Sequence, residues 1–268
     1  MHLYQNQFSE THDFPRVEKP SRVLVIASTA RCGSHMLGHA LHQTGMFGFP
    51  LEYAHPANVE EWKKRFGLDD FRQTLDEIQR RRTSPNGVFG IKVHYPHLRQ
   101  FGGFEGLTRF FPDARYVLLT RKDVLNQAVS HSIASQTGVW ISGQEPVNDN
   151  PRYDFAHIEQ CLRQAILYNS SWRYALAASG SQYIELDFDQ VRRDPVQSIL
   201  KIADLVDIDV DPERIPREQV TTKQGSRRNA EWARRFVTEF DLSRELVTDE
   251  EHGFVRRIRS EVRKLMRA

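Results

Sequence analysis

The stretch "VLVIASTARCGSHMLGHAL", residues 23–41, predicts a strand, a tight turn and a helix in that order. An apolar run is followed by small and polar residues, and apolar residues then return at helical spacing. This arrangement is the usual cradle for a phosphate group, because backbone N–H groups and the helix dipole face the anion. The turn lacks the Gly-Lys-Ser/Thr ending of ATP- and GTP-hydrolysing proteins. The sequence therefore predicts a phosphate-bearing ligand of another kind.

The rest of the chain predicts one α/β domain. Strand-like apolar runs at residues 22–28, 88–94, 115–120 and 182–188 alternate with helical patterns, and the long charged pattern over residues 58–82 is broken near Gly67. We therefore expect a central parallel sheet of the P-loop type flanked by helices, with ligands beyond the carboxyl ends of the strands. Residues 1–20 are expected to form a flexible, poorly packed arm, and residues 21–268 a single domain.

Composition excludes several classes of protein. The formal charge of +2 over 268 residues is too small to predict nucleic-acid binding, and Cys32 and Cys161 form neither a disulfide framework nor a zinc-ligand spacing. No stretch approaches the roughly 18 apolar residues of a membrane span, and the N-terminus has no signal-peptide core. We expect a cytoplasmic protein. The amphipathic pattern over residues 243–268 leaves peripheral membrane contact open beside an ordinary solvated helix.

The turn itself supplies five candidate ligand-binding residues in a row: Arg31, Cys32, Gly33, Ser34 and His35. Glycine lets the backbone approach a ligand closely, and the amides at the helix start favour an anion. Arg31 adds a permanent positive charge and Ser34 a hydroxyl. The alternative is a plain strand–helix turn with a capping serine.

Two further motifs follow later strands. In "YVLLTRKDVLNQAVSHSIASQ", Arg121 stands at a strand end and Ser130 lies nine residues later on the next helix, so both can reach one phosphate; helix capping is the alternative. In "GVFGIKVHYPH", Lys92 and His94 alternate along a strand and project from one side, towards either the cleft or solvent.

The fourth motif, "TTKQGSRRNAEWARRF", is a basic loop that precedes a helix. A basic loop beside an aromatic residue suits a nucleotide phosphate and base, although a charged surface loop would look the same. The candidates here are Lys223, Gly225, Arg227, Arg228 and Trp232.

Together the four motifs resemble those of the sulfotransferases that use 3′-phosphoadenosine 5′-phosphosulfate (PAPS). Within that superfamily the sequence is most similar to the bacterial trehalose 2-sulfotransferase family, through "PLEY" (50–53), "SPNGVFGIK", "QAVS" and "AEW". The likeness covers roughly residues 22–240. Cys32, where serine is usual, and His94, which the trehalose enzyme lacks, depart from the pattern.

The resemblance implies a role for each motif. Residues 31–34 would hold the phosphosulfate, Arg121 and Ser130 the 3′-phosphate, and the late basic loop would complete the donor site. The reaction would transfer the sulfuryl group in line to a hydroxyl of a carbohydrate or glycolipid, without a metal, in a homodimer. Arg31 and Lys92 would stabilise the leaving oxygen.

Two residues compete as the catalytic base. Glu52 lies in "PLEY", where the related family has its proposed base, whereas His94 stands two residues after Lys92, as the base does in many cytosolic sulfotransferases. The resemblance favours Glu52, provided that nearby cations do not depress its pKa. Two other functions stay open: a P-loop nucleotide kinase or GTPase, and a non-catalytic protein that binds adenosine 3′,5′-bisphosphate.

Overall fold

A four-stranded parallel sheet forms the centre of the computed structural model, which describes residues 6–141, 144–217 and 227–241. The strands are β1 (Arg22–Ser28), β2 (Val88–His94), β3 (Arg115–Thr120) and β4 (Tyr183–Asp187), and their order in the sheet is β2-β1-β3-β4. The first three have the bounds that the apolar runs predicted. The predicted α/β fold with a parallel sheet flanked by helices is confirmed.

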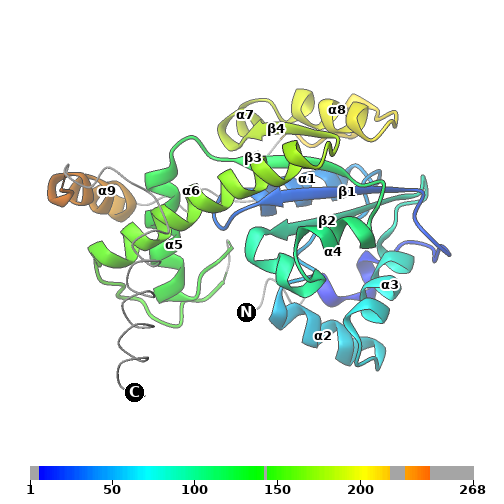
Figure 1. Cartoon of the computed structure of the whole chain (residues 1–268), viewed down its shortest axis with the longest axis horizontal. Helices are drawn as coiled ribbons and strands as arrows, with labels where there is room; N and C mark the ends of the chain where they lie inside the picture. The colour runs from blue at the N-terminus through cyan, green and yellow to red at the C-terminus, as the bar shows by residue number, and fades with distance from the viewer. Residues whose placement is uncertain (1–5, 142–143, 218–226, 242–268) are drawn as a thin grey trace, which may run out of the picture.

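Helices cover both faces of the sheet (Figure 1). They are α1 (Ser34–Gln43), α2 (Pro56–Phe66), α3 (Phe71–Arg82), α4 (Phe104–Phe110), α5 (Val124–Thr137), α6 (Phe155–Ala178), α7 (Phe188–Arg193), α8 (Pro195–Leu205) and α9 (Arg227–Glu239), with short 3-10 segments at Asn6–Phe8, Glu10–His12, Tyr95–Phe101 and Pro212–Arg214. Gly67 ends α2 with φ +64°, which explains why the long charged pattern splits there.

The alternation of side chains along each strand divides the core in two. Val25 and Ala27 pack with residues of α2, α3, α4 and α6 on one face, whereas Leu24 and Ile26 pack with α1, α7 and α8 on the other. All four side chains are completely buried. Because both faces are covered here, residues 23–27 of β1 are all apolar.

A third, smaller cluster holds α5, α6 and α9 together at one end of the sheet (Figure 1). Trp232 and Phe236 of α9 pack there against Ala128 of α5 and Ile158 of α6. This cluster fixes α5, and with it the side chains that α5 directs towards the end of β1.

The described part of the N-terminal arm is packed, which differs from the loose arm that the sequence suggested. Arg82 is fully buried and donates to the carbonyl oxygens of Gln7 and Ser9 at 2.8 and 2.9 Å, and its Nε lies 2.9 Å from Asp13 Oδ1. Phe8 meets the edge of Trp62 at 5.1 Å. A buried guanidinium needs acceptors, and residues 7–13 supply them.

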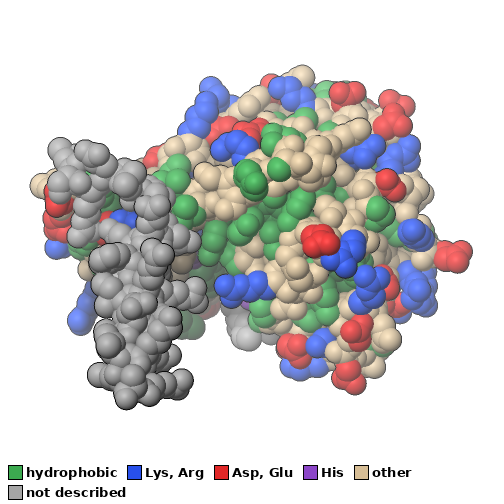
Figure 2. Space-filling view, viewed as in Figure 1, with side chains coloured by type: hydrophobic (Ala, Val, Ile, Leu, Met, Phe, Trp, Pro, Cys, Tyr) green, Lys and Arg blue, Asp and Glu red, His purple; other side chains and the backbone are tan. Residues whose placement is uncertain are grey.

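Figure 2 shows positive and negative side chains interspersed over the visible face. Within the described ranges, none of the helices has the length and apolar character that a bilayer crossing requires. The predicted amphipathic segment at 243–268, and Lys223 and Gly225 of the basic loop, lie outside the described residues.

Candidate active site

The turn after β1 has a backbone that few sequences can adopt. Arg31 has φ +64° and Gly33 has φ +87°, and α1 begins at the next residue. A Cβ on Gly33 would lie 2.0 Å from Cδ2 of Phe188, so both the left-handed backbone and the neighbouring ring require glycine. The positive φ of Arg31 is strained for a residue with a side chain, and such strain is typical of functional turns.

The N-terminus of α1 has no side-chain cap. Gly33 occupies the capping position, and the hydroxyl of Ser34 lies instead 3.3 Å from Nε2 of His94. The capping-serine alternative is therefore not what the structure shows. The first amides of α1 keep their capacity to bind an anion.

Side chains of α5 and α6 form hydrogen bonds with the start of the turn. Gln127 of α5 donates to Thr29 Oγ1 at 2.9 Å and to the carbonyl oxygen of Ala30 at 2.7 Å, and Thr29 in turn donates to Asn169 of α6 at 3.3 Å. Trp172 donates from its indole to the carbonyl oxygen of Ser28 at 3.1 Å. The turn therefore has a defined shape without a ligand.

Arg31 and Ser130 form one pair. Arg31 Nε donates to Ser130 Oγ at 3.0 Å, and another nitrogen of the same guanidinium donates to the carbonyl oxygen of Trp140. The sequence had assigned Ser130 to the same phosphate as Arg121. The structure shows the contact of Ser130 with Arg31, and its shared role with Arg121 at a phosphate stays a prediction.

Arg121 lies at the end of β3 with its guanidinium 5.6 Å from the centre of the Phe188 ring. Its Nε is buried and has no hydrogen-bond partner among the described residues. A buried donor without a hydrogen-bond partner, on a permanently charged side chain, lowers the stability of the fold unless a ligand accepts its hydrogen bond. Phe188 thus contacts both the turn and Arg121.

Glu52, Lys92 and His94 lie side by side. Lys92 Nζ is 2.7 Å from Glu52 Oε1, and His94 Nε2 is 3.8 Å from the same oxygen. The backbone positions them, because Leu51 pairs with β2 through a parallel bridge and accepts the N–H of Lys92 at 2.9 Å. The side chains of Lys92 and Glu52 are only 1% and 11% exposed, so Lys92 points inwards rather than to solvent.

Burial and neighbouring charges determine the protonation states of Glu52 and His94. Burial alone would raise the pKa of Glu52, but Lys92, His94 and His97 outweigh it and hold that pKa well below its usual range. Burial lowers the pKa of His94 to about 4, against the opposing effect of Glu52. At neutral pH Glu52 is therefore an ionised carboxylate paired with Lys92, and His94 is a neutral imidazole.

A family model described as Stf0 sulphotransferase matches residues 23–239. The chain belongs to this family. It is 26% identical to the trehalose 2-sulfotransferase of Mycobacterium tuberculosis and 25% identical to that of Mycolicibacterium smegmatis. The alignments cover 81% and 82% of this chain and 95% of each relative.

Among solved structures, the chain is similar to a sulfotransferase from Alicyclobacillus acidocaldarius, with a TM-score of 0.51 and 18% sequence identity. The match covers 83% of this chain and 92% of the other. This likeness supports the fold alone.

The side chains of two predicted residues of this sulfotransferase are buried. Cys32 is fully buried in the core with α1, and burial raises the pKa of its thiol, so only its backbone, as expected for the turn, remains for a ligand. Trp232 is 6% exposed and packs in the α5–α6–α9 cluster rather than offering a free ring. Arg227 and Arg228 are exposed at the start of α9.

His35 lies in the first turn of α1 and contacts His39, with 4.4 Å between the ring centres. Burial lowers the pKa of His35 to about 2, so the imidazole is neutral and cannot supply positive charge to a phosphate. The predicted role of His35 in binding the donor is thus restricted to its backbone amide and a neutral ring.

Sequence reasoning missed Gln127 and His97 in this sulfotransferase. Gln127 is 1% exposed, and its signal was a polar residue at a buried helical position within "QAVS". His97 follows β2, 7% exposed, and its ring stacks on His94 with 5.1 Å between centres. No metal cluster was predicted, because 42 residues separate Glu52 from His94 in the chain. The structure places these two and His97 with their ligand atoms within 4.8 Å of one another.

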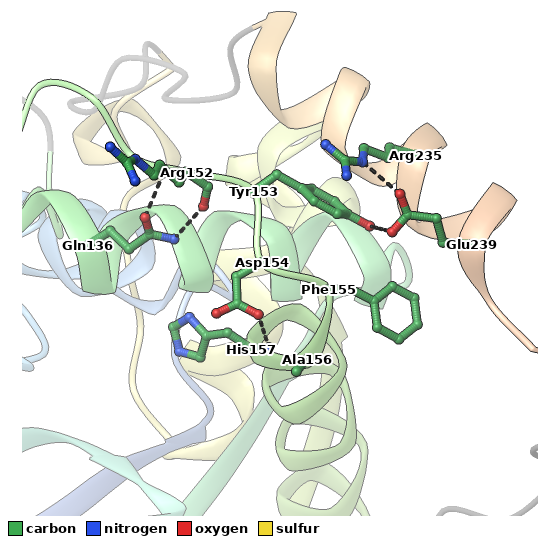
Figure 3. Close-up of a pocket in the computed structure, with 9 residues that line it drawn as sticks. All are labelled: Gln136, Arg152, Tyr153, Asp154, Phe155, Ala156, His157, Arg235 and Glu239. Atoms are coloured by element: carbon green, nitrogen blue, oxygen red, sulfur yellow. Dashed lines mark hydrogen bonds and ion pairs between the residues drawn. The ribbon is translucent and has the colours of Figure 1, made fainter.

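A separate hollow of about 570 Å³ lies where α5, α6 and α9 meet (Figure 3). Tyr153 donates to Glu239 at 3.0 Å, Glu239 also binds Arg235 at 2.7 Å, and Gln136 exchanges hydrogen bonds with the backbone of Arg152. None of its lining residues is a predicted site residue. Its described contacts tie the segment before α6 to α9.

Proposed function

We propose that this protein transfers the sulfuryl group of PAPS to a hydroxyl of a carbohydrate or glycolipid by in-line displacement. The observation that carries the proposal is the meeting, at one end of the sheet, of an uncapped α1 N-terminus with the Lys92–Glu52–His94 group. Membership in the sulfotransferase family supplies the reaction class, and the trehalose 2-sulfotransferase relatives suggest a sugar acceptor.

The residues present fit an adenosine 3′-phosphate 5′-phosphosulfate. The α1 amides and Arg31 would hold the phosphosulfate, and the unpartnered Nε of Arg121 would bind the 3′-phosphate. Phe188 would provide an apolar surface beside them. Ser130, hydrogen-bonded to Arg31, would position that guanidinium and donate its hydroxyl to the same ligand.

When bound, PAPS supplies a sulfuryl group on a 5′-phosphate leaving group. Negative charge develops on the bridging oxygen, and fixed donors at such a position contribute about 10²–10³ in rate. Lys92 would protonate or hydrogen-bond that oxygen, together with Arg31 and the amides of the turn. No step requires a metal.

Glu52 would accept the proton of the acceptor hydroxyl. In the resting site its pKa is too low for an effective base, because Lys92 pairs with it. Once Lys92 turns to the leaving oxygen, the buried carboxylate loses that partner and its pKa rises towards neutrality. One movement of Lys92 would thus prepare both the acid and the base.

His94 is the runner-up for the base. Its imidazole is neutral at pH 7, and its Nε2 faces both Ser34 and Glu52. Glu52→Gln should lower turnover by about two to four decades with nearly unchanged nucleotide affinity, and His94→Asn should cost less turnover and more affinity. An inactive His94→Asn beside a nearly normal Glu52→Gln would transfer the role to the histidine.

The donor is tested by calorimetry with adenosine 3′,5′-bisphosphate and adenosine 5′-monophosphate. The protein should prefer the bisphosphate, and Arg121→Ala should remove roughly 10- to 100-fold of that preference, the value of a hydrogen bond to a charged group. Arg192→Ala is the matched control, since Arg192 also faces the Phe188 ring, at 6.0 Å, but from α7. Equal affinity of the unaltered protein for both nucleotides would refute the donor assignment.

Transfer is tested with ³⁵S-labelled PAPS, a panel of sugars and cell-envelope extracts. Label should pass to a carbohydrate or glycolipid in the presence of EDTA. A requirement for magnesium would favour the kinase alternative, although Ser34 and His35 stand where a P-loop has its lysine and hydroxyl. Nucleotide binding without any transfer would favour the non-catalytic alternative.

A further inference from the structure

Glu52, His94 and His97 converge from two segments that are distant in sequence. Glu52 follows the bridge to β2, His94 ends β2, and His97 lies in the 3-10 segment directly after it. One potential ligand atom from each lies within 4.8 Å of the other two, and the Glu52–His94 separation is 3.8 Å. Two imidazoles and a carboxylate form a ligand set that suits Zn²⁺ and similar transition metals, whereas Mg²⁺ prefers oxygen ligands alone.

The spacing of the three ligand atoms is close to, but wider than, that of a zinc site. Zn–N bonds of about 2.0–2.1 Å require tetrahedral ligand atoms roughly 3.4 Å apart. The Glu52–His94 pair is near that spacing, and a rotation of the His97 ring would close the rest. The His94 and His97 rings are stacked, with an angle of 22° between their planes, so a ring rotation is needed before both can direct a nitrogen at one ion.

One neighbouring charge opposes an ion at this site. Lys92 Nζ lies 2.7 Å from the same Glu52 oxygen that faces His94, so the ion would have to displace Lys92 or bind the other carboxylate oxygen.

We propose that Glu52, His94 and His97 bind one Zn²⁺ ion, and that the ion inhibits the enzyme. Binding rests on the three side chains alone, whereas inhibition rests on the proposed function. The ion would occupy both Glu52 and His94, the two residues that compete as base, and its charge would push Lys92 away from Glu52. Excess zinc would therefore switch transfer off reversibly.

Binding is tested first, on chelator-treated protein, with Zn²⁺ by calorimetry and with Co²⁺ by its visible absorption. The unaltered protein should bind one ion per chain. His97→Gln should weaken binding at least about tenfold, since even an outer partner of a ligand is worth roughly 10- to 100-fold. His55→Gln is the control, because His55 contacts the His97 ring at 5.3 Å but is not part of the ligand set.

If His97→Gln does not fold, the unaltered protein still decides the matter. Zn²⁺ should protect His94 and His97 from diethylpyrocarbonate, as located by peptide mass, and should leave His157 as reactive as before. No binding by the unaltered protein, equal binding by a folded His97→Gln, or unprotected rings would each overturn the site.

The activity arm uses the same variants. Zn²⁺ should inhibit transfer by the unaltered protein, EDTA should restore it, and whatever activity His97→Gln retains should resist Zn²⁺. Activation by Zn²⁺, or equal inhibition of the variant, would overturn the inhibitory role. A protein that binds Zn²⁺ through these residues yet transfers no sulfuryl group would refute the proposed function and leave the metal site standing.

Discussion

Mild acid should destabilise the protein through two partly buried histidines of α1. His39 and His42 lie one turn apart beside Phe49; the His42 ring stacks on it at 3.8 Å and the His39 ring meets it edge-on at 5.2 Å. His42 Nδ1 lies 3.1 Å from the carbonyl oxygen of Gly48, to which the neutral ring can donate. Burial lowers the pKa of each imidazole to about 4, with Lys92 adding to the effect at His39.

The sign and size follow from these pKa values. In the unfolded chain a histidine has a pKa of about 6.5. As pH falls below this value, the unfolded state binds more protons than the folded state, and the free energy of unfolding decreases. The stabilisation is complete above pH 6.5 and is lost as pH falls towards 4. Between pH 7 and pH 5 each histidine should remove about 2 kcal/mol from the free energy of unfolding, and the pair about 4 kcal/mol. A typical domain has only about 5–15 kcal/mol in total.

Urea denaturation at pH 7, 6 and 5 measures this loss, followed by tryptophan fluorescence. His39→Gln cannot take up the proton, so its free energy of unfolding should fall by about 2 kcal/mol less than that of the unaltered protein over the same range. Lys201→Gln serves as the control, because Lys201 is exposed on α8 and its replacement leaves every histidine in place. If His39→Gln and the unaltered protein lose stability in parallel, His39 is not buried as a neutral ring.

Three other measurements test the structure. Lys92→Met and Glu52→Gln should each lower the free energy of unfolding by about 3–5 kcal/mol, because each leaves a buried charge unpaired. The double variant should lose clearly less stability than the sum of the two single losses. If the losses simply add in urea denaturation, the pair is not formed. Gly33→Ala should destabilise by more than about 1 kcal/mol and weaken nucleotide binding, since its φ is +87° and its Cβ would collide with Phe188; normal calorimetric affinity would contradict this. Light scattering at micromolar concentration should give twice the 31.2 kDa chain mass if the predicted homodimer forms, and a monomer mass would reject it.

The sheet could be predicted from the sequence because its strands are covered on both faces, and such strands are recognisable as short, continuous apolar runs. The break at Gly67 was predictable for a similar reason, since the left-handed end of a helix favours glycine. The packing of residues 6–14 was not predictable. It depends on the burial of Arg82, about 70 residues away in sequence, and on acceptors that are mostly backbone carbonyls.

The sequence predicts that Arg31, Lys92 and Arg121 lie at one edge of the sheet, because parallel strands bring their carboxyl ends together. It does not predict which side chains pair there. The hydrogen bond from Arg31 to Ser130 joins residues 99 positions apart, and no local pattern encodes such a contact. His97 was missed because it lies near Glu52 only when Leu51 pairs with β2 in the folded chain.

The hydrogen bonds that hold the turn after β1 affect how fast the donor can bind. They are made by Gln127, Thr29, Asn169 and Trp172. These side chains hold the turn through hydrogen bonds from two helices that the rest of the fold already anchors. The turn's conformational entropy is therefore lost during folding and not again when a nucleotide arrives. Association should then proceed at the rate of diffusional encounter with a ready surface, in a single kinetic phase, and differences in donor affinity should reside in the dissociation rate.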